Sequence, residues 1–324
     1  MSTNSWRFGK LVLWCLSAGL GVALQPVLAL ELLVGSWNTH SIRRYDLSTN
    51  QYLGDLVPPG SGGLNIPDGM DFGPDGHLYV SSSQTDRVLR YDGQTGTFLG
   101  AFVTQQLNMP GNLKFGPDGL LYVANKGTGQ VLRFHPQTGA LVDVFASGGG
   151  LQQPVGLLWD EGYLYVSDFT GNAIRRFNAT NGAFVDTFAT LSTPLILNLD
   201  PQGHLLVSSH MDSMIWRYET ATGTRIGPAL IGGPVSCPVG HLFADGDLIV
   251  ASWQNHRLLR YAADGTFIQT MVNNGPLRLP NDLLIRPIPE PAVGLFAIVA
   301  IICCRSRIRL GSKGRMRSSP PMTG

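Results

Sequence analysis

The chain is built from short apolar runs separated by polar turns, and this pattern repeats at nearly regular intervals. Residues 68–110 and 111–154 are the clearest copies, and each contains four such runs. In the first copy, the runs lie at residues 70–72, 77–81, 87–91 and 98–102. The turns between them are rich in Gly, Asp and Pro, which suit the backbone angles of tight turns. The pattern therefore predicts four short antiparallel strands per unit, here called a, b, c and d.

An arginine followed by an aromatic residue recurs once in every unit, at the end of strand c. The pairs are Arg44-Tyr45, Arg90-Tyr91, Arg133-Phe134, Arg176-Phe177, Arg217-Tyr218 and Arg260-Tyr261. Successive aromatic residues are 46, 43, 43, 41 and 43 residues apart. A period of about 40 to 45 residues with four strands per unit is typical of a β-propeller, in which twisted sheets cover their apolar faces by stacking on one another. We therefore predict an all-β fold, a six-bladed β-propeller with four-stranded blades.

The two ends of the repeat region complement each other. The first unit starts with a b-like run at residues 32–35 and has no strand a of its own. After the sixth unit, residues 280–285 begin with Pro and an apolar run, as strand a does at Pro67 and Pro110. We predict that N-terminal strands b, c and d and C-terminal strand a close the ring, which removes an open sheet edge. The propeller is predicted to span residues 30–288 as one domain.

The N-terminus has the composition of an export signal. Arg7 and Lys10 precede an apolar stretch at residues 11–24, and Val27-Leu28-Ala29 suits a signal peptidase. Residues 1–29 are therefore predicted to be a signal peptide, with an uncleaved anchor as the alternative.

The C-terminus, residues 289–324, carries a second addressing pattern. Pro289-Glu290-Pro291 is followed by the uncharged run 292–304 and then by six basic residues. This order resembles a PEP-CTERM sorting signal, although its apolar run is shorter than the ~20 residues that span a bilayer. The resemblance implies an exosortase-type processing enzyme as a partner, and attachment to the membrane through this segment before processing. A plain C-terminal anchor is the alternative, and either would place the domain in the cell envelope, on the outer surface or extracellularly.

Charge separates the ends from the body of the chain. Eight of the 23 basic residues and one of the 22 acidic residues, Glu290, lie in the two ends, which leaves 15 basic against 21 acidic residues. This balance excludes nucleic acid as an expected partner. Cys237 is the one cysteine of the body, so an internal disulfide is not expected there.

The repeated motifs resemble those of known propeller families. Each unit reads Pro-x-Gly-apolar, Gly-Pro-Asp-Gly-x-Leu-Tyr-Val, apolar-Arg-Tyr and Thr-Gly in its best copies. This is similar to NHL-repeat propellers and to the related streptogramin-lyase and regucalcin/gluconolactonase (SMP-30-like) families, over residues 31–288. The resemblance implies the fold, but it leaves the chemistry open, because these families include lactonases, lyases and proteins that bind without catalysis.

The loops at one end of the propeller are the expected location of a ligand site. If strand a starts on one face, the b–c and d–a loops return to that face. The residues eight positions before each aromatic residue should then ring the channel mouth as a ligand-binding face, and they are Trp37, Ser83, Lys126, Phe169, His210 and Trp253. The residues five positions before the aromatic add His40, Asp86 and His256 nearby. Loops on a rigid scaffold are where binding residues concentrate.

A central metal ion is the enzymatic possibility that the resemblance implies. Regucalcin-like propellers hold a divalent cation with Glu, Asn and Asp side chains at the inner blade ends, and Asp68 and Asn281 match two of those positions. Ca²⁺ or Mg²⁺ would suit such oxygen ligands. Asn112 is one residue out of register, and we find no counterpart of the N-terminal Glu ligand. The favoured alternative is that Asp68 and Asn281 bond to backbone groups at the strand starts.

A lyase-like reaction would need a general base, and His210 and His241 are the candidates on the predicted ligand face. Neither histidine has a recognisable partner in the sequence. We therefore expect an exported, surface-sorted binding or scaffolding module with a protein or glycan ligand at the channel mouth. The alternative is a metal-dependent lactonase or a streptogramin-lyase-like enzyme on the same face.

Overall fold

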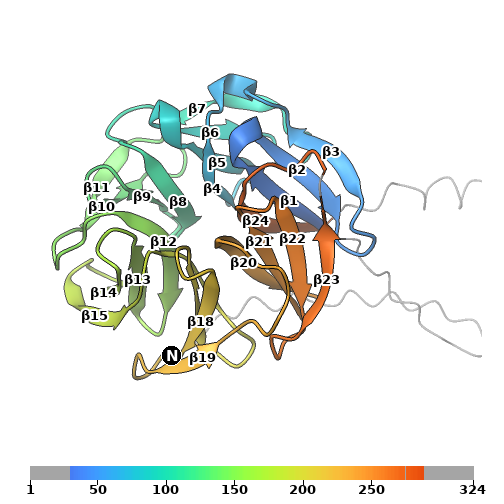
Figure 1. Ribbon diagram of the computed structural model, residues 1–324. Coiled ribbons are helices and arrows are strands. Elements are labelled where there is room, and N and C mark those ends of the chain that lie inside the picture. Colours follow the sequence, from blue (N-terminus) through green and yellow to red (C-terminus); the bar gives the residue numbers. More distant parts are fainter. Residues whose placement is uncertain (1–29, 274, 288–324) are drawn as a thin grey trace, which may run out of the picture. The chain divides into compact units, whose positions relative to one another are not determined.

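The computed structural model describes residues 30–273 and 275–287, and these residues form strands joined by turns and short 3-10 helices. They contain six antiparallel sheets of four strands each. Figure 1 shows the sheets standing as blades around a common axis. The predicted all-β, six-bladed propeller is thereby confirmed. The predicted signal peptide and sorting tail lie outside the described residues.

The blades are numbered here in chain order. Blade 1 contains β24 (Pro280–Pro287), β1 (Leu30–Ser36), β2 (Ser41–Asp46) and β3 (Tyr52–Val57), and blade 2 contains β4 (Pro67–Phe72), β5 (Leu78–Ser82), β6 (Arg87–Tyr91) and β7 (Phe98–Val103). Blade 3 contains β8 (Pro110–Phe115), β9 (Leu121–Asn125), β10 (Gln130–Phe134) and β11 (Leu141–Ala146), and blade 4 contains β12 (Pro154–Asp160), β13 (Tyr163–Asp168), β14 (Ala173–Asn178) and β15 (Phe184–Thr190). Blade 5 contains β16 (Pro194–Leu199), β17 (Leu205–Ser209), β18 (Met214–Tyr218) and β19 (Arg225–Pro228), and blade 6 contains β20 (Pro238–Ala244), β21 (Asp247–Ser252), β22 (Arg257–Tyr261) and β23 (Phe267–Val272). The 3-10 helices are η1 (Trp37–Thr39), η2 (Ser61–Gly63) and η3 (Ser83–Thr85).

Blade 1 closes the ring as predicted. Its strand order is β24-β1-β2-β3, so the last strand of the described chain is the innermost strand of the first blade. In Figure 1 the orange β24 lies beside the blue β1. A buried ion pair joins these two strands, because the Arg286 guanidinium contacts the Glu31 carboxylate and both residues are about 5% exposed. Arg286 also donates to the carbonyl of Gln94 at 3.1 Å, which ties blade 1 to blade 2.

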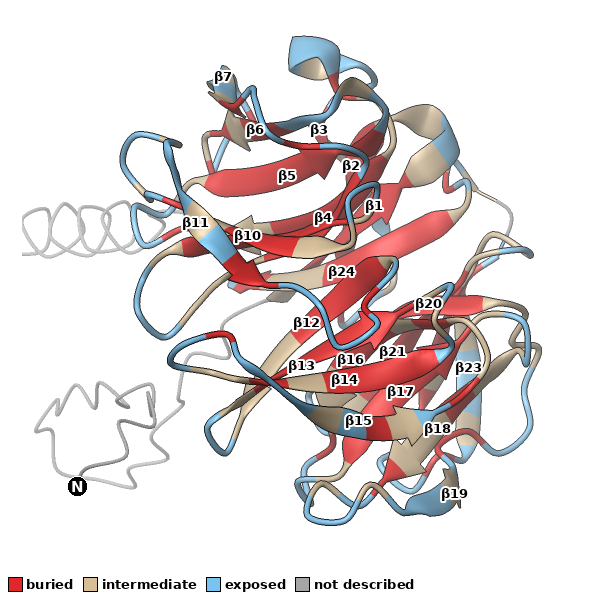
Figure 2. Ribbon diagram, turned by 90° about the vertical axis from the view of Figure 1, so that its left-hand side faces the viewer, coloured by how far each residue is buried: buried red, intermediate tan, exposed pale blue. Residues whose placement is uncertain are grey.

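The blades are held together by apolar packing between neighbouring sheets. One cluster joins Leu33 and Ile42 of blade 1 to Val80 and Tyr91 of blade 2, and all four are fully buried. The aromatic residue of every Arg-aromatic pair is 2% exposed or less. Figure 2 shows this buried layer running through the inner strands, while the outer strands carry the exposed positions. Burial of such side chains is the main stabilising term of the fold.

The repeated Thr-Gly turn between strands c and d also contributes to contacts between blades. Gly96 has φ +72°, and a Cβ atom there would come within 1.7 Å of the carbonyl oxygen of Leu56 in blade 1. Glycine is therefore required at this position both for the backbone angle and for the close approach. The same approach recurs at Gly139, where a Cβ would lie 2.1 Å from the Phe102 oxygen.

The repeated arginine has an architectural role. Arg133 pairs with Asp143 on the neighbouring strand with contacts of 2.8 and 2.5 Å, and Arg176 pairs with Asp186 in the same way. These hydrogen bonds lower the pKa of both aspartates.

Among the described residues, no helix combines the length and the apolar character needed to cross a membrane.

Candidate ligand-binding site at the channel mouth

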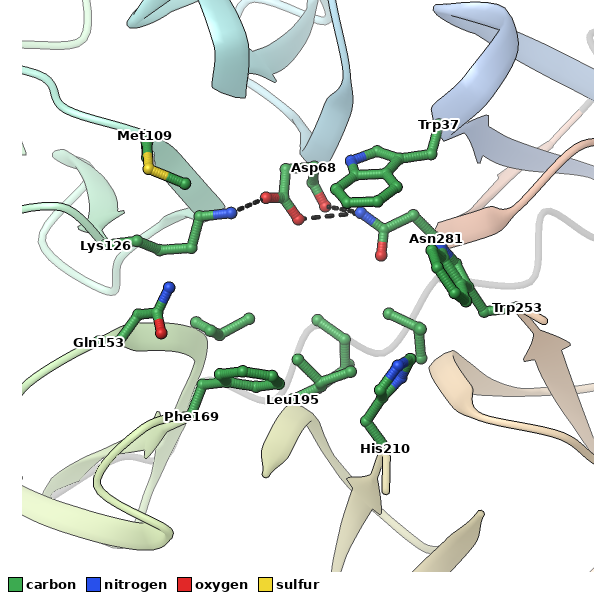
Figure 3. Close-up of a pocket in the computed structure, with 13 residues that line it drawn as sticks. Trp37, Asp68, Met109, Lys126, Gln153, Phe169, Leu195, His210, Trp253 and Asn281 are labelled. Atoms are coloured by element: carbon green, nitrogen blue, oxygen red, sulfur yellow. Dashed lines mark hydrogen bonds and ion pairs between the residues drawn. The ribbon is translucent and has the colours of Figure 1, made fainter. Parts of the chain in front are cut away.

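The a strands begin around the propeller axis, and at this end lies a cavity of about 270 Å³. Figure 3 shows its lining side chains converging on the axis. All six blades contribute, with the lining residues Trp37, Asp68, Met109, Lys126, Gln153, Val155, Phe169, Leu195, Ile196, His210, Val239, Trp253 and Asn281. The backbone repeats from blade to blade, but most of these side chains differ; Trp37 and Trp253 share one repeat position, and Val155 and Val239 share another. At the cavity, the chain therefore departs from its own repeat.

Most of the predicted ring of ligand-face residues lines this cavity. The five that do are Trp37, Lys126, Phe169, His210 and Trp253. Ser83 is the exception: it lies in η3, is 2% exposed and is not among the lining residues. Its short side chain occupies the equivalent backbone position but does not line the cavity, and its place on the ligand face stays a prediction.

The sequence reasoning missed Met109 and Gln153, which also line the cavity. Each directly precedes the proline that opens a strand a, Pro110 in blade 3 and Pro154 in blade 4. Because strand a is the innermost strand, the residue before it lies at the mouth. The proline that marks strand a was thus a signal that could have identified both residues.

The backbone before strand a is bound to both neighbouring blades. At Leu279, the carbonyl accepts the Trp37 N–H at 3.2 Å and the N–H donates to His256 Nδ1 at 3.1 Å. At Thr193, the carbonyl accepts the His210 N–H at 3.2 Å and the N–H donates to Asn172 Oδ1 at 2.9 Å. These bonds fix the loops that carry the lining residues.

The hydrogen bonds that hold the residue before strand a to the preceding blade are called the latch here. The predicted neighbours of the ring belong to this latch and are absent from the cavity lining: His40, Asp86 and His256. Each has a left-handed backbone, with φ of 51°, 53° and 60°. Each side chain accepts the N–H of the residue before the next strand a, at 2.7 to 3.1 Å. These three side chains therefore satisfy backbone donors of the loops beside the cavity, and their contribution to ligand binding stays a prediction.

Three polar side chains form one wall of the cavity. Asn281 Nδ2 donates to Asp68 Oδ1 at 2.9 Å and to the Asp68 carbonyl at 3.1 Å. The Lys126 ammonium pairs with Asp68 Oδ2. Figure 3 shows this chain of contacts running from blade 1 through blade 2 to blade 3. The side chains of Lys126 and Asp68 are 11% and 10% exposed, so the pair is largely shielded from solvent.

In this arrangement a lysine and an amide N–H₂ group surround the Asp68 carboxylate. Lys126 supplies the positive charge beside Asp68 that a cation would supply, and Asn281 presents its N–H₂ group to the carboxylate. Asn112 does not join them, because its Nδ2 faces Asp282 Oδ2 at 3.5 Å. Within the described part of the chain, no group of three or more His, Cys, Asp or Glu side chains is placed to hold a metal. The central Ca²⁺ or Mg²⁺ stays a prediction for titration.

The opposite wall is apolar and largely aromatic. Trp253 contacts Trp37 edge to face with ring centroids 5.6 Å apart, and His210 in the same manner at 5.4 Å. Burial lowers the pKa of His210, which favours the neutral imidazole. Phe169 and Leu195 continue this wall through blades 4 and 5. The cavity therefore has one hydrogen-bonding side and one side suited to stacking.

A second cavity of about 230 Å³ shares Ile196 with the mouth cavity. Lys114 Nζ lies 3.9 Å from Asp71 Oδ1 there. Asp282 accepts the N–H of Met70 at 2.9 Å, and burial raises its pKa to about 6 although Lys114 lowers it. Burial lowers the pKa of Lys114, but the attraction of Asp71 and Asp282 outweighs this and raises it overall.

The two candidate general bases do not lie in the same cavity. His210 lines the mouth cavity, whereas His241 lines the second cavity and is 2% exposed. Burial lowers the pKa of His241 to about 4. His241 occupies the strand position that holds Leu157 in blade 4 and Leu283 in blade 1, which places it among packing side chains.

Comparison with known proteins supports the fold. No family model matches the chain, and no curated protein matches its sequence. A chain from the crystal structure of a nidogen/laminin complex matches with a TM-score of 0.67 and 15% identity, over 79% of this chain and 98% of that chain. A protein of unknown function from Bacteroides caccae matches with a TM-score of 0.65 and 15% identity, over the same shares. At this identity the likeness shows the six-bladed propeller alone, and function must be argued from the site.

Proposed function

We propose that this protein is an exported binding or scaffolding module whose protein or glycan partner docks at the channel mouth. The observation that carries the proposal is the mouth cavity, to which all six repeated blades contribute lining side chains of mostly different kinds. A rigid propeller with short connections holds such side chains in place before a ligand arrives, which lowers the cost of binding. One structural relative comes from a nidogen/laminin complex, and that setting agrees with a binding role.

The place of action follows from the chain ends. Residues 1–29 have the pattern of a signal peptide, and residues 289–324 resemble a PEP-CTERM tail that an exosortase-type enzyme would process. The propeller would then act in the cell envelope or on the outer surface, with the tail as its membrane attachment before processing. Protease treatment of intact cells tests this placement, because a surface-exposed propeller becomes accessible while a cytoplasmic control protein does not.

Binding is preferred over a lactonase or lyase because of how the polar groups are used. Asp68 is already neutralised by Lys126, and the two histidines with altered pKa lie in different cavities. Catalysis by general base needs a titratable group within reach of the reacting atom and of the groups that stabilise the transition state. The described residues around the mouth offer recognition groups in place of such a constellation.

The proposal is tested by filling the cavity. Leu195→Trp adds bulk at the cavity wall without removing a polar group, whereas Ile226→Trp adds the same bulk on the outer strand β19, where Ile226 is 49% exposed. The full-length chain and both variants, each purified in mild detergent and immobilised, are presented with polysaccharide and protein fractions of the envelope. We expect the chain and the Ile226 variant to retain a common component that the Leu195 variant releases. Equal retention by all three, or retention by none, would refute the mouth as the binding site.

A further inference from the structure

The mouth cavity has two unlike walls, and the division follows the blade order except at Trp37 of blade 1, Met109 of blade 3 and Gln153 of blade 4. Asn281, Asp68 and Lys126 come from blades 1, 2 and 3 and face the axis from one side. Phe169, Leu195, His210 and Trp253 come from blades 4, 5 and 6 and face it from the other. A ligand that fits both walls must itself have one polar and one apolar side.

The polar wall offers donors and acceptors side by side. The carboxylate of Asp68 has lone pairs beyond those used by Asn281 and Lys126, and the ammonium of Lys126 has N–H groups beyond the one that faces Asp68. Figure 3 shows the side-chain oxygen of Asn281 pointing into the cavity. A hydroxyl group both donates and accepts, so a row of hydroxyls matches such a wall better than a group that does only one.

The charge of this wall is balanced within the protein. Lys126 and Asp68 neutralise each other, and both are about nine-tenths buried. A charged ligand would have to compete with this pairing, whereas a neutral hydroxylated ligand adds hydrogen bonds to it. An apolar side chain from a protein partner would cover the ion pair without satisfying it, which costs free energy. The polar wall therefore favours a neutral, hydrogen-bonding ligand.

The aromatic wall suits the C–H face of a ring. Trp253 is held by edge-to-face contacts with Trp37 and His210, so its ring has a fixed orientation at the cavity surface. The cavity volume of about 270 Å³ is at the small end for ligand pockets, which commonly measure about 300 to 1,000 Å³. One ring of a larger molecule fits this space, while a folded segment does not.

We propose that the mouth cavity holds one neutral sugar ring of a glycan. Its hydroxyls would face Asp68, Lys126 and Asn281, and its C–H face would lie on the Trp253 and Phe169 side. This inference rests on the proposed function and names the ligand class for the same cavity. The Lys126–Asp68 pair would supply the hydrogen-bonding groups, and Lys126 the positive charge beside the carboxylate. Recognition of the sugar would then not depend on a divalent cation.

The test uses a panel of simple sugars with the full-length chain in mild detergent. The methyl glycosides of glucose, galactose, mannose and N-acetylglucosamine are compared with glucuronic acid and glucosamine by saturation-transfer NMR and calorimetry. We expect at least one neutral glycoside to bind more tightly than the acid and the amine. Binding of none of the neutral glycosides, or tighter binding of a charged sugar, would overturn the proposal.

Variants of each wall give two independent readouts. Asp68→Leu combined with Lys126→Met removes the polar wall but keeps its bulk, and we expect sugar affinity to fall about tenfold or more, as for the loss of charged hydrogen bonds. Phe169→Leu alters the opposite wall, leaves the ion pair intact, and should weaken the same sugar. Unchanged sugar affinity in a folded double variant, judged by its circular dichroism, would overturn the proposal. If that variant misfolds, unchanged affinity in Phe169→Leu would do so.

The same double variant separates this inference from the proposed function. If the envelope component released by Leu195→Trp is a protein that the double variant holds more tightly, an apolar anchor fills the cavity and the sugar is wrong, while the binding function stands. If Leu195→Trp releases nothing, the binding function itself fails.

Discussion

The ammonium of Lys126 pairs with the carboxylate of Asp68 across the boundary between blades 3 and 2, at the mouth of the propeller channel. Lys126 lies in the loop after β9, and Asp68 lies at the start of β4. The two residues therefore occupy different positions within their repeat units. A lysine at the ring position of one blade thus reaches the axial position of another. In the resembling propellers an axial carboxylate would contact a metal, and here it contacts a side chain.

Removing Lys126 is therefore expected to create a weak cation site. In Lys126→Ala, Asp68 keeps its place through Asn281 but loses its neutralising charge, so Ca²⁺ or Mg²⁺ can take the free carboxylate and amide oxygens. Calorimetric titration of the full-length chain should detect no binding at micromolar Ca²⁺ or Mg²⁺, and the variant should bind in the millimolar range of weak extracellular sites.

The controls for this titration are Asp68→Ala and Asn281→Ala. Adding Asp68→Ala to Lys126→Ala should abolish the new site. Micromolar binding by the unmodified chain that each single control abolishes would contradict the expectation. It would also restore the metal-dependent lactonase as the leading function and call for a lactone screen.

The latch at the channel mouth gives a second prediction. Asn172 has φ +48°, and its Oδ1 accepts the N–H of Thr193. Asn172→Gly keeps the left-handed conformation and loses the hydrogen bond, whereas Asn172→Ala loses the bond and strains the backbone. We expect the Ala variant to be less stable than the Gly variant by about 1 kcal/mol, measured by urea unfolding. Equal stabilities, or a more stable Ala variant, would show that this backbone angle is not enforced.

Blade 3 already contains the glycine version of this latch, since Gly129 occupies the equivalent position with φ +66°. There the next loop is held differently: the N–H of Gln153 donates to Asp168 Oδ1 at 2.8 Å. Gln153 keeps an ordinary negative φ and its side chain lines the cavity.

The repeat was readable from the sequence because it follows from local rules. The turn residues, the apolar alternation and the Arg-aromatic spacing each constrain one blade, and the unmatched ends at residues 32–35 and 280–285 define the closure. The lining was partly readable, because side chains eight positions before the aromatic residue share one backbone position. Whether such a side chain reaches the cavity depends on its length, which is why Lys126 does and Ser83 does not.

The contacts between side chains of different blades could not be predicted from the sequence. The pairing of Lys126 with Asp68 depends on how far a lysine extends around the ring, and the use of His256 as a backbone acceptor depends on a left-handed residue. The repeat spacing gives neither the reach of a side chain nor the sign of φ. Left-handed conformation at a histidine has no strong local signature, because glycine and asparagine are the residues that adopt it routinely.

Ring closure gives a third prediction. Arg286 of β24 and Glu31 of β1 form an ion pair in which both residues are about 5% exposed. Arg286→Ala would leave the buried Glu31 carboxylate with only the longer, 3.6 Å contact to the partly exposed Arg44, which we expect to cost about 3 kcal/mol of unfolding free energy. Urea unfolding of the full-length chain measures this cost. Arg87→Ala, at an exposed residue of β6, serves as the control.

A companion variant separates the charge from the packing. In Glu31→Gln combined with Arg286→Met, no charge remains buried, so most of the lost stability should return. If the single and the double variants are equally destabilised, the pair matters through its shape and its hydrogen bonds to blade 2, and the charge argument is wrong.

The second cavity makes stability depend on pH in two opposing ways. The pKa of His241 is about 4 in the folded chain against 6.5 ordinarily, so the folded state binds fewer protons there and loses stability as the pH falls from 6.5 towards 4. The pKa of Asp282 is about 6 against 3.8, so the folded state binds more protons there and gains stability as the pH falls from 6 towards 4. The two contributions cancel in part.

His241→Leu removes the contribution of His241 to the pH dependence of stability and leaves that of Asp282. Leucine already occupies the equivalent position in blades 3, 4, 5 and 1, as Leu113, Leu157, Leu197 and Leu283, so the blade should accept it. Relative to the unmodified chain, the variant should gain on the order of 3 kcal/mol of unfolding free energy between pH 6.5 and pH 4, since each pKa unit corresponds to about 1.4 kcal/mol. Urea unfolding at several pH values between 4 and 7 measures the difference, and Asp282→Asn should shift it in the opposite direction over the same range. A difference that does not change with pH would show that His241 titrates in the folded chain as it does in the unfolded one, and that the second cavity is open to water.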